Sequence, residues 1–164
     1  DPNRQDTDTM PDSTIIFSAI HGLAATVWVG GMFFAYFILR PSLGQLEPPQ
    51  RLAVWNSVFK RFLKLVWIIV IALPLTGYAQ VYMDFGDFDS AGLAINSMHI
   101  VGLLMIALFV YLYVGPYQKF GAAVAASEWP VAAGHLNSIR QIVHANTMLG
   151  LITVVIGSSG RFWG

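Results

Sequence analysis

Residues 15–39, IIFSAIHGLAATVWVGGMFFAYFIL, decide the fold class of this chain because they form a long, uncharged apolar run. The run exceeds the roughly 20 residues that a helix needs to cross a bilayer. One face of such a helix would combine a histidine with small, aromatic and thioether side chains: His21, Ala25, Trp28 and Met32. A histidine inside a membrane-spanning helix is costly to bury, so His21 is the first candidate functional residue.

The composition of the whole chain points to the same class. Of its 164 residues, 55% are hydrophobic and 11% are charged, and the mean hydropathy is +0.60. These values indicate an integral membrane protein in contact with a lipid bilayer. The absence of cysteine excludes disulfides, thiolate metal sites and haem attachment through a C-x-x-C-H motif. Nine basic residues balance nine acidic ones, so no nucleic-acid partner is expected.

The apolar runs predict an all-α fold, an integral membrane four-helix bundle. After an extramembrane tail at 1–13, a single domain at 14–164 is expected. Its helices are predicted at roughly 14–39, 62–82, 94–116 and 138–158.

Proline and capping residues set the predicted helix ends. Arg40-Pro41 and Gly115-Pro116 are expected to end the first and third helices, and Pro74 is expected to kink the second. Asn137-Ser138 is a plausible N-cap pair for the fourth. The connection at 41–61 carries an amphipathic stretch that would extend the second helix. The connection at 117–137 is long enough for a short surface helix.

The charged residues divide unequally between the two sides of this bundle. One side is basic: Arg40, Arg51, Lys60, Arg61, Lys64, Lys119 and Arg140. The other side is mainly acidic: Asp1, Asp6, Asp8, Asp12, Asp84, Asp87 and Asp89, with Arg4 and Arg161. The positive-inside rule therefore predicts an N-out/C-out orientation. In a bacterium, this corresponds to a multi-pass protein of the inner (cytoplasmic) membrane with both termini in the periplasm.

His21 and His99 lie at matched depth in two helices that run in the same direction. Each is about seven residues into its helix, or roughly 10 Å below the outer surface at 1.5 Å per residue. Four-helix bundles commonly hold cofactors between facing helices, and two imidazoles suit the iron of haem b. Ala25 and Gly102, one turn further along, would lie against the ring, and Trp28 would either pack on the ring or line the bundle core.

Two residues near the outer side are candidates to bind the haem propionates, namely Arg161 and Gln80. Two alternatives to haem remain open at this point. His21, His99 and Met98 could ligate Cu(I), which prefers imidazole and thioether ligands. Each histidine could instead only hydrogen-bond to a neighbouring helix.

A second polar site is expected near the inner face, in the fourth helix. Arg140, His144 and Thr147 share one face of that helix. They could serve a quinone head group, a proton path or a second haem, or could simply make polar contacts to neighbouring helices. His144 lies too far from the outer side to share one iron with His21 and His99 if the helices are straight.

Three stretches resemble the copper resistance protein D family. They are HGLAATVWVGGMFF from His21 with the following Leu39-Arg40-Pro41, Phe59-Lys-Arg-Phe with Leu75-Thr-Gly-Tyr, and RQIVHANTMLGL from Arg140 with Gly157 and Gly160-Arg161. The resemblance covers roughly residues 14 to 161 and implies a four-helix inner-membrane domain linked by name to copper uptake or tolerance.

The chain is also similar to a wider group of small haem b membrane proteins, including the bacterial membrane-bound protoporphyrinogen oxidase. In that group, the histidine that matches His21 ligates haem, and the third helix often carries a lysine where this chain has His99. That difference weakens assignment as a protoporphyrinogen oxidase and favours bis-histidine ligation.

Together, these observations predict a b-type cytochrome-like protein that transfers electrons through one bis-histidine haem b near the periplasmic face. Six-coordinate iron leaves no position for substrate, so an electron-transfer subunit is more plausible than a stand-alone enzyme. The redox partner would be a quinol or a periplasmic redox protein, and the chain would act within a larger membrane complex or homo-oligomer. The rival hypotheses are a copper uptake or tolerance protein without haem and a structural membrane subunit.

Overall fold

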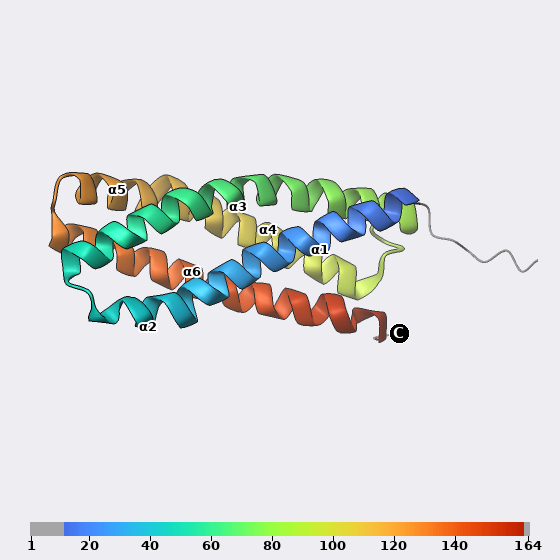
Figure 1. Ribbon diagram of the computed structural model, residues 1–164. Helices are drawn as coiled ribbons and strands as arrows, with labels where there is room; N and C mark the ends of the chain where they lie inside the picture. Colours follow the sequence, from blue (N-terminus) through green and yellow to red (C-terminus); the bar gives the residue numbers. More distant parts are fainter. Residues whose placement is uncertain (1–11, 163–164) are drawn as a thin grey trace, which may run out of the picture.

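The computed structural model describes residues 12–162, apart from the side chains of Asp12 and Arg161, as an antiparallel bundle of four long helical segments (Figure 1). Each segment is long and apolar enough to cross a membrane: Ser13–Gln45, Pro48–Asp84, Gly92–Ala125 and Trp129–Ser159. No β-strand occurs between residues 12 and 162. The predicted all-α membrane bundle is therefore confirmed.

Each segment is built from one or more helical elements. The first contains α1 (Asp12–Phe33), the π-helical η1 (Phe34–Leu39), α2 (Arg40–Ser42) and the 3-10 turn η2 (Leu43–Gln45). The second is α3 (Pro48–Asp84). The third contains α4 (Gly92–Leu112), the π-helical η3 (Tyr113–Tyr117) and α5 (Gln118–Ala125). The fourth is α6 (Trp129–Ser159), followed by the 3-10 turn η4 (Gly160–Phe162).

The two ends of the bundle differ in what they carry (Figure 1). At the terminal end lie the start of α1, the end of α6 and the connection at 85–91. At the opposite end, which we call the basic end, lie the short connections at 46–47 and 126–128. The basic residues that the sequence predicts on one side of the membrane lie in the half of the bundle nearer this end.

The helices extend further at the basic end than the sequence predicts. Pro41 and Pro116 do not end the first and third segments, because a π-helical stretch precedes Pro41 and another contains Pro116. In a π-helical turn, each hydrogen bond joins residues five apart instead of four, so a different carbonyl lies opposite the proline. The helix can therefore continue although proline has no N–H to donate. The third segment therefore continues to Ala125 instead of ending at Gly115-Pro116.

The starts of the second and fourth helices also differ from the prediction. α3 starts at Pro48 instead of near 62, and α6 starts at Trp129 instead of at Asn137-Ser138. In both, a proline occupies the first turn, where its missing N–H costs nothing. The amphipathic stretch within 41–61 extends the second helix, as predicted. The short surface helix expected within 117–137 is instead a continuation of the third and fourth segments.

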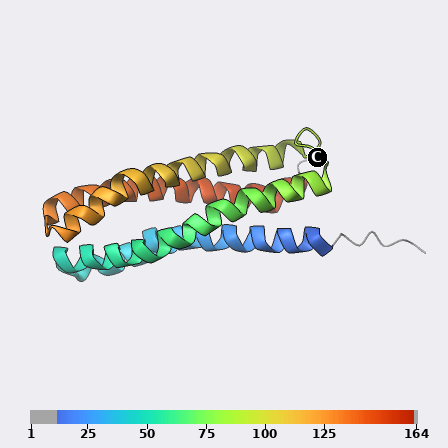
Figure 2. The same cartoon turned by 90° about the horizontal axis from the view of Figure 1, so that it is seen from above.

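The four long segments pack mainly as two pairs. α1 packs mainly against α3, and α4 packs mainly against α6 (Figure 2). α3 and α4 meet through large rings: Trp67 and Phe109 have centroids 5.1 Å apart, and those of Tyr78 and His99 are 5.3 Å apart. The tightly packed core includes Trp28, Leu52, Val66, Phe109, Phe120 and Ile139.

The outer surface of the bundle is apolar along much of its length. Large aliphatic side chains that are more than 60% exposed occur on all four long helices: Leu23, Ile68, Leu75, Ile100 and Val155. An apolar surface this extensive needs an apolar environment. The protein is therefore a multi-pass membrane protein whose exposed side chains contact lipid.

Candidate functional site

Three polar pairs join α1 and α3 along the terminal half of the bundle. They are Thr14 with Asp84, Ser18 with Gln80, and His21 with Thr76, at 3.2, 2.9 and 3.0 Å. Because the two helices are antiparallel, the pairs follow one another turn by turn. They hold α1 in a fixed rotation against α3 and so determine the face on which His21 lies.

Thr76 fixes the state of the His21 ring. The Thr76 hydroxyl, which is buried, donates its proton to carbonyls of its own helix, with Ala72 O at 2.7 Å and Leu73 O at 3.2 Å. Its lone pair is therefore free to accept from Nδ1–H of His21, 3.0 Å away. This network assigns the proton to Nδ1 and leaves Nε2 with a lone pair. Histidines that bind metals commonly have this arrangement, with the second ring nitrogen donating to a protein oxygen.

His99, from α4, lies among aromatic rings. Its ring centroid is 4.9 Å from that of Phe88 and 5.3 Å from that of Tyr78. Within residues 12–162, neither ring nitrogen of His99 has a hydrogen-bond partner. The half-buried His99 is therefore positioned by packing, and both its nitrogens remain available.

His21 and His99 line the same cavity of about 420 Å³. This volume lies within the roughly 300–1,000 Å³ typical of small-molecule and cofactor sites. Three other residues predicted from the sequence also line it: Ala25, Trp28 and Gly102. Gln80 lies on its wall too, whereas the side chain of Arg161 is outside the described part of the chain. His144 does not line this cavity.

Glycines make the cavity possible. A Cβ placed on Gly22 or Gly102 would meet no atom within 4 Å, so both glycines face open space. A Cβ on Gly77 would lie 3.2 Å from Cε1 of His21, and one on Gly157 would lie 3.1 Å from Sδ of Met98. The first two glycines keep the interior open, and the other two allow His21 and Met98 to lie close to a neighbouring helix.

Met98 and His99 both line the cavity although they are adjacent in α4. Adjacent residues point in different directions on a helix. Here Met98 approaches Gly157 of α6, whereas His99 approaches Tyr78 of α3. The cavity thus extends around α4, and it presents a thioether and two imidazoles. In residues 12–162, no group of three or more His, Cys, Asp or Glu side chains is arranged to hold a metal ion.

The connection at 85–91 contributes Phe85 and Phe88 to the wall of the cavity. The Phe88 carbonyl accepts a hydrogen bond of 2.9 Å from Nδ2 of Asn96. The pKa of Asp87 lies below its ordinary value because the Ser90 side chain and backbone N–H donate to the carboxylate. The Ser90 N to Asp87 Oδ1 distance is 2.7 Å. These bonds hold the ring of Phe88 over His99.

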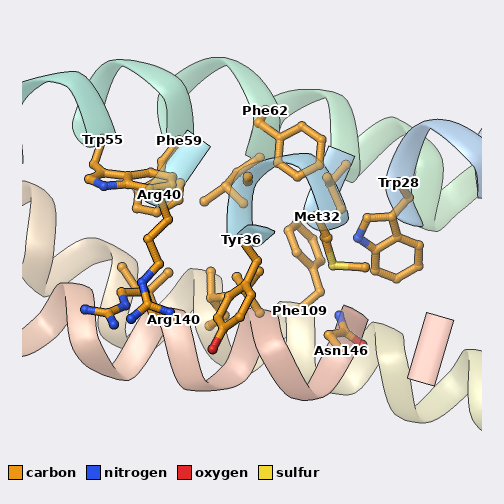
Figure 3. A pocket seen from close by; sticks show the side chains of 16 residues that line it. Trp28, Met32, Tyr36, Arg40, Trp55, Phe59, Phe62, Phe109, Arg140 and Asn146 are labelled. Carbon is orange, nitrogen blue, oxygen red and sulfur yellow. The ribbon is translucent and has the colours of Figure 1, made fainter. Parts of the chain in front are cut away.

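The residues expected to form a second polar site occupy different surroundings near the basic end. Arg140 lines a smaller pocket of about 40 Å³ (Figure 3). His144 is exposed and stacks on Tyr36, with centroids 4.7 Å apart and planes at 21°. Thr147 is buried and donates to the carbonyl of Val143 at 2.6 Å. The structure thus does not bring the three side chains into one cavity.

Several residues that contact the two histidines were not identified from the sequence. Thr76, Tyr78 and Phe88 contact the two histidines, yet each looks like an ordinary membrane-helix or interface residue. Leu-Thr-Gly-Tyr at 75–78 directly after Pro74 was the available signal, because it places a hydroxyl, a glycine and a ring beside a proline. Gly22 and Gly157 follow a similar pattern, since small residues beside a histidine or a methionine indicate close approach.

Comparison with known proteins assigns the family. The family model for copper resistance protein D matches residues 56–159, which is more than half of the chain. The chain belongs to the copper resistance protein D family. The matched region contains Met98 and His99, whereas His21 lies before it.

One curated relative is an uncharacterized protein of Aquifex aeolicus (strain VF5). It is 30% identical over 99 residues, and the alignment covers 59% of this chain and 64% of that protein. No solved structure matches the chain. The comparisons therefore support the family and a copper-resistance membrane protein.

Proposed function

We propose that this copper resistance D protein binds one haem b in the large cavity, with His21 and His99 as axial ligands, and acts in electron transfer. The observation that carries the proposal is the shared cavity: two histidines from different helices line about 420 Å³ of mainly apolar space. A single metal ion held by side chains needs only ligand atoms about 2 Å away. A volume this large favours an extended cofactor.

The residues around the cavity fit this group. Hydrogen bonding assigns the lone pair of His21 to Nε2, and both nitrogens of His99 lack a hydrogen-bond partner within 12–162. Gly22 and Gly102 leave open space where any larger residue would place a side chain. Gln80, near the terminal end, could bind a carboxylate through the second N–H of its amide, because the first donates to Thr76 O at 3.0 Å.

When bound, haem supplies a one-electron couple whose potential depends on its axial ligands and on burial. The chain itself contributes the positions of both imidazoles. Thr76 holds the first by a hydrogen bond, and Tyr78 and Phe88 hold the second by ring packing. If both histidines held the iron, no position would remain for a substrate, and this favours electron transfer. The partner we propose is a quinol or a periplasmic redox protein, reached directly or within a larger membrane complex.

Copper handling is the second candidate, favoured by the family and by Met98. Sδ of Met98 lies in the same cavity wall as His21 and His99, and thioether with imidazole suits Cu(I). Under this alternative, the three side chains would bind copper without haem during uptake or tolerance. Metal content and absorption spectrum separate the two candidates, because Cu(I) is colourless in the visible range.

We also propose that the protein lies in a bacterial inner membrane with both termini outside. The basic end would face the cytoplasm, as the positive-inside rule requires. The chain has no cysteine, so single substitutions can report sidedness directly. Asp89→Cys should react with an impermeant maleimide on intact spheroplasts, and Lys119→Cys should react only after lysis. The reverse pattern would contradict the orientation.

Histidine variants test the ligand assignment. His21→Ala and His99→Ala should each remove the low-spin α and β bands of the reduced protein, because each deletes one axial ligand. His144→Ala is the matched control, since this exposed histidine lies outside the cavity, and it should keep the full spectrum. Retention of the low-spin bands in His99→Ala would remove His99 from the site. Loss of the bands in His144→Ala would contradict the separation of the two polar regions.

A further inference from the structure

Two arginines reach into one small pocket at the basic end of the bundle. Arg40, from α2, and Arg140, from α6, both line the pocket of about 40 Å³, together with aromatic side chains that include Tyr36 and Trp55 (Figure 3). The Cζ atom of Arg40 lies 5.1 Å from the centroid of the Tyr36 ring. The side chains of two arginines therefore line one pocket, whose walls are almost entirely apolar.

These two cations have no counter-ion in the described part of the chain. The acidic residues on this side of the membrane are Glu47 and Glu128, and neither forms an ion pair with Arg40 or Arg140 within 12–162. Nε of Arg140 is buried and has no hydrogen-bond partner among the described residues. Like charges in a medium of low dielectric constant repel strongly. An arrangement of this kind calls for an anion.

The position of both arginines matches the headgroup level of a membrane. Between Arg40 and the nearest preceding charged residue, Asp12, the chain carries no charge, and the same holds from Arg140 to Arg161. At 1.5 Å per residue, the two uncharged stretches are roughly 40 and 30 Å long, enough to cross the roughly 30 Å hydrocarbon core. Arg40 and Arg140 thus mark one boundary of the hydrocarbon layer, where the phosphate groups of lipids lie.

We propose that Arg40 and Arg140 form a binding site for a phosphate-type anion, carried by a lipid headgroup or free in solution. Guanidinium groups match phosphate oxygens in pairs of parallel hydrogen bonds, and neither Arg40 nor Arg140 has a counter-ion within residues 12–162. The pocket that the two side chains line is about 40 Å³, which is too small for a second tetrapyrrole.

The test measures apparent Kd from the melting temperature of the purified full chain in dodecylmaltoside. One arm adds phosphatidylglycerol to the micelles, with phosphatidylcholine as the lipid control, and a second arm adds inorganic phosphate. Stabilisation by phosphatidylglycerol alone identifies the lipid as the source, and stabilisation by inorganic phosphate identifies the free anion. If neither probe stabilises the wild-type chain, the proposal is overturned.

Variants then locate the effect. Arg40→Gln and Arg140→Gln should each weaken apparent Kd by about 10- to 100-fold, the range for losing hydrogen bonds to a charged group. Lys60→Gln is the matched control, because Lys60 is an exposed basic residue in the same half of the bundle. It should leave Kd nearly unchanged. An equal loss in Lys60→Gln would mean that only overall charge matters and would overturn the site.

Lysine variants keep the proposal testable if the glutamine variants do not fold. Arg40→Lys and Arg140→Lys retain the charge and lose the paired geometry of the guanidinium group. They should bind the active probe more weakly than the wild type. Wild-type affinity in both lysine variants would overturn the assignment of paired hydrogen bonds.

Discussion

The hydrogen bond between Thr76 and His21 gives the sharpest single-residue prediction. Thr76→Val keeps the β-branched shape of the side chain and removes the hydroxyl that accepts from Nδ1–H of His21 at 3.0 Å. The site of Thr76 is only 5% exposed, so water does not readily replace the lost acceptor. The variant should therefore loosen the imidazole without deleting it.

The size of the effect follows both from the buried donor and from the hydrogen bond that orients the histidine. Leaving a buried donor without a partner costs about 1–3 kcal/mol. Loss of an outer hydrogen bond to a metal-binding histidine typically lowers metal affinity by about 10–100-fold, which corresponds to about 1.4–2.8 kcal/mol. We expect haem to bind Thr76→Val about 10- to 100-fold more weakly, with a shifted potential in the protein that remains loaded.

The assay is haem titration of the apoprotein in detergent, followed by the growth of the low-spin absorption bands. Thr26→Val is the matched control: this exposed threonine also lies in a spanning helix, and its hydroxyl donates only to Gly22 O of its own helix, at 2.7 Å. It should bind haem like the wild type. Equal affinity in the two valine variants, with haem binding abolished in His21→Ala, would refute the positioning role of Thr76.

Three further predictions concern packing, the cavity and the connection at 85–91. Gly102 faces open space, so Gly102→Leu should block cofactor binding and leave the melting temperature of the apoprotein nearly unchanged. Gly102→Ala should bind the cofactor nearly normally. Haem titration and thermal melting of both variants check these outcomes. Trp28 is 3% exposed and packs edge-on against Phe109, so Trp28→Ala should lower stability by about 3–5 kcal/mol in denaturant unfolding. The pKa of Asp87 is lower in the folded chain than in the unfolded one because Ser90 donates to the carboxylate. The stability that these hydrogen bonds add is therefore complete at pH values above the pKa of the unfolded state, and it is lost as the pH falls through the pKa of the folded state. Hydrogen exchange at the Ser90 amide, corrected for intrinsic rate, should therefore show less protection at acidic than at neutral pH, and Asp87→Asn should show little such change.

Much of the fold could be predicted because the hydrophobic runs that form its helices are long and clear in the sequence. Long uncharged apolar runs specify spanning helices, and their number and order match the structure. The helix ends could not be predicted, because the rule that proline ends a helix holds best in water. Pro41 and Pro116 instead lie next to or inside π-helical turns that absorb the missing hydrogen bond.

For the candidate site too, some features could be predicted from the sequence and others could not. Matched depth along parallel helices was enough to bring His21 and His99 to one cavity, since depth follows from the helical rise alone. Contacts that depend on how one helix is rotated against another could not be predicted from the sequence. Thr76 contacts His21 because the polar pairs between α1 and α3 fix one rotation, and Arg40 joins Arg140 because the first segment continues past Pro41. Neither relation is visible in the spacing of residues along one helix.

The most direct test of the central claim is the absorption spectrum of the purified wild-type protein, reduced with dithionite minus oxidised, together with its metal content. If His21 and His99 ligate haem b, the spectrum will show a sharp α band and a β band, with about one iron per chain. A colourless protein that carries copper, or one that carries neither metal, would contradict the account.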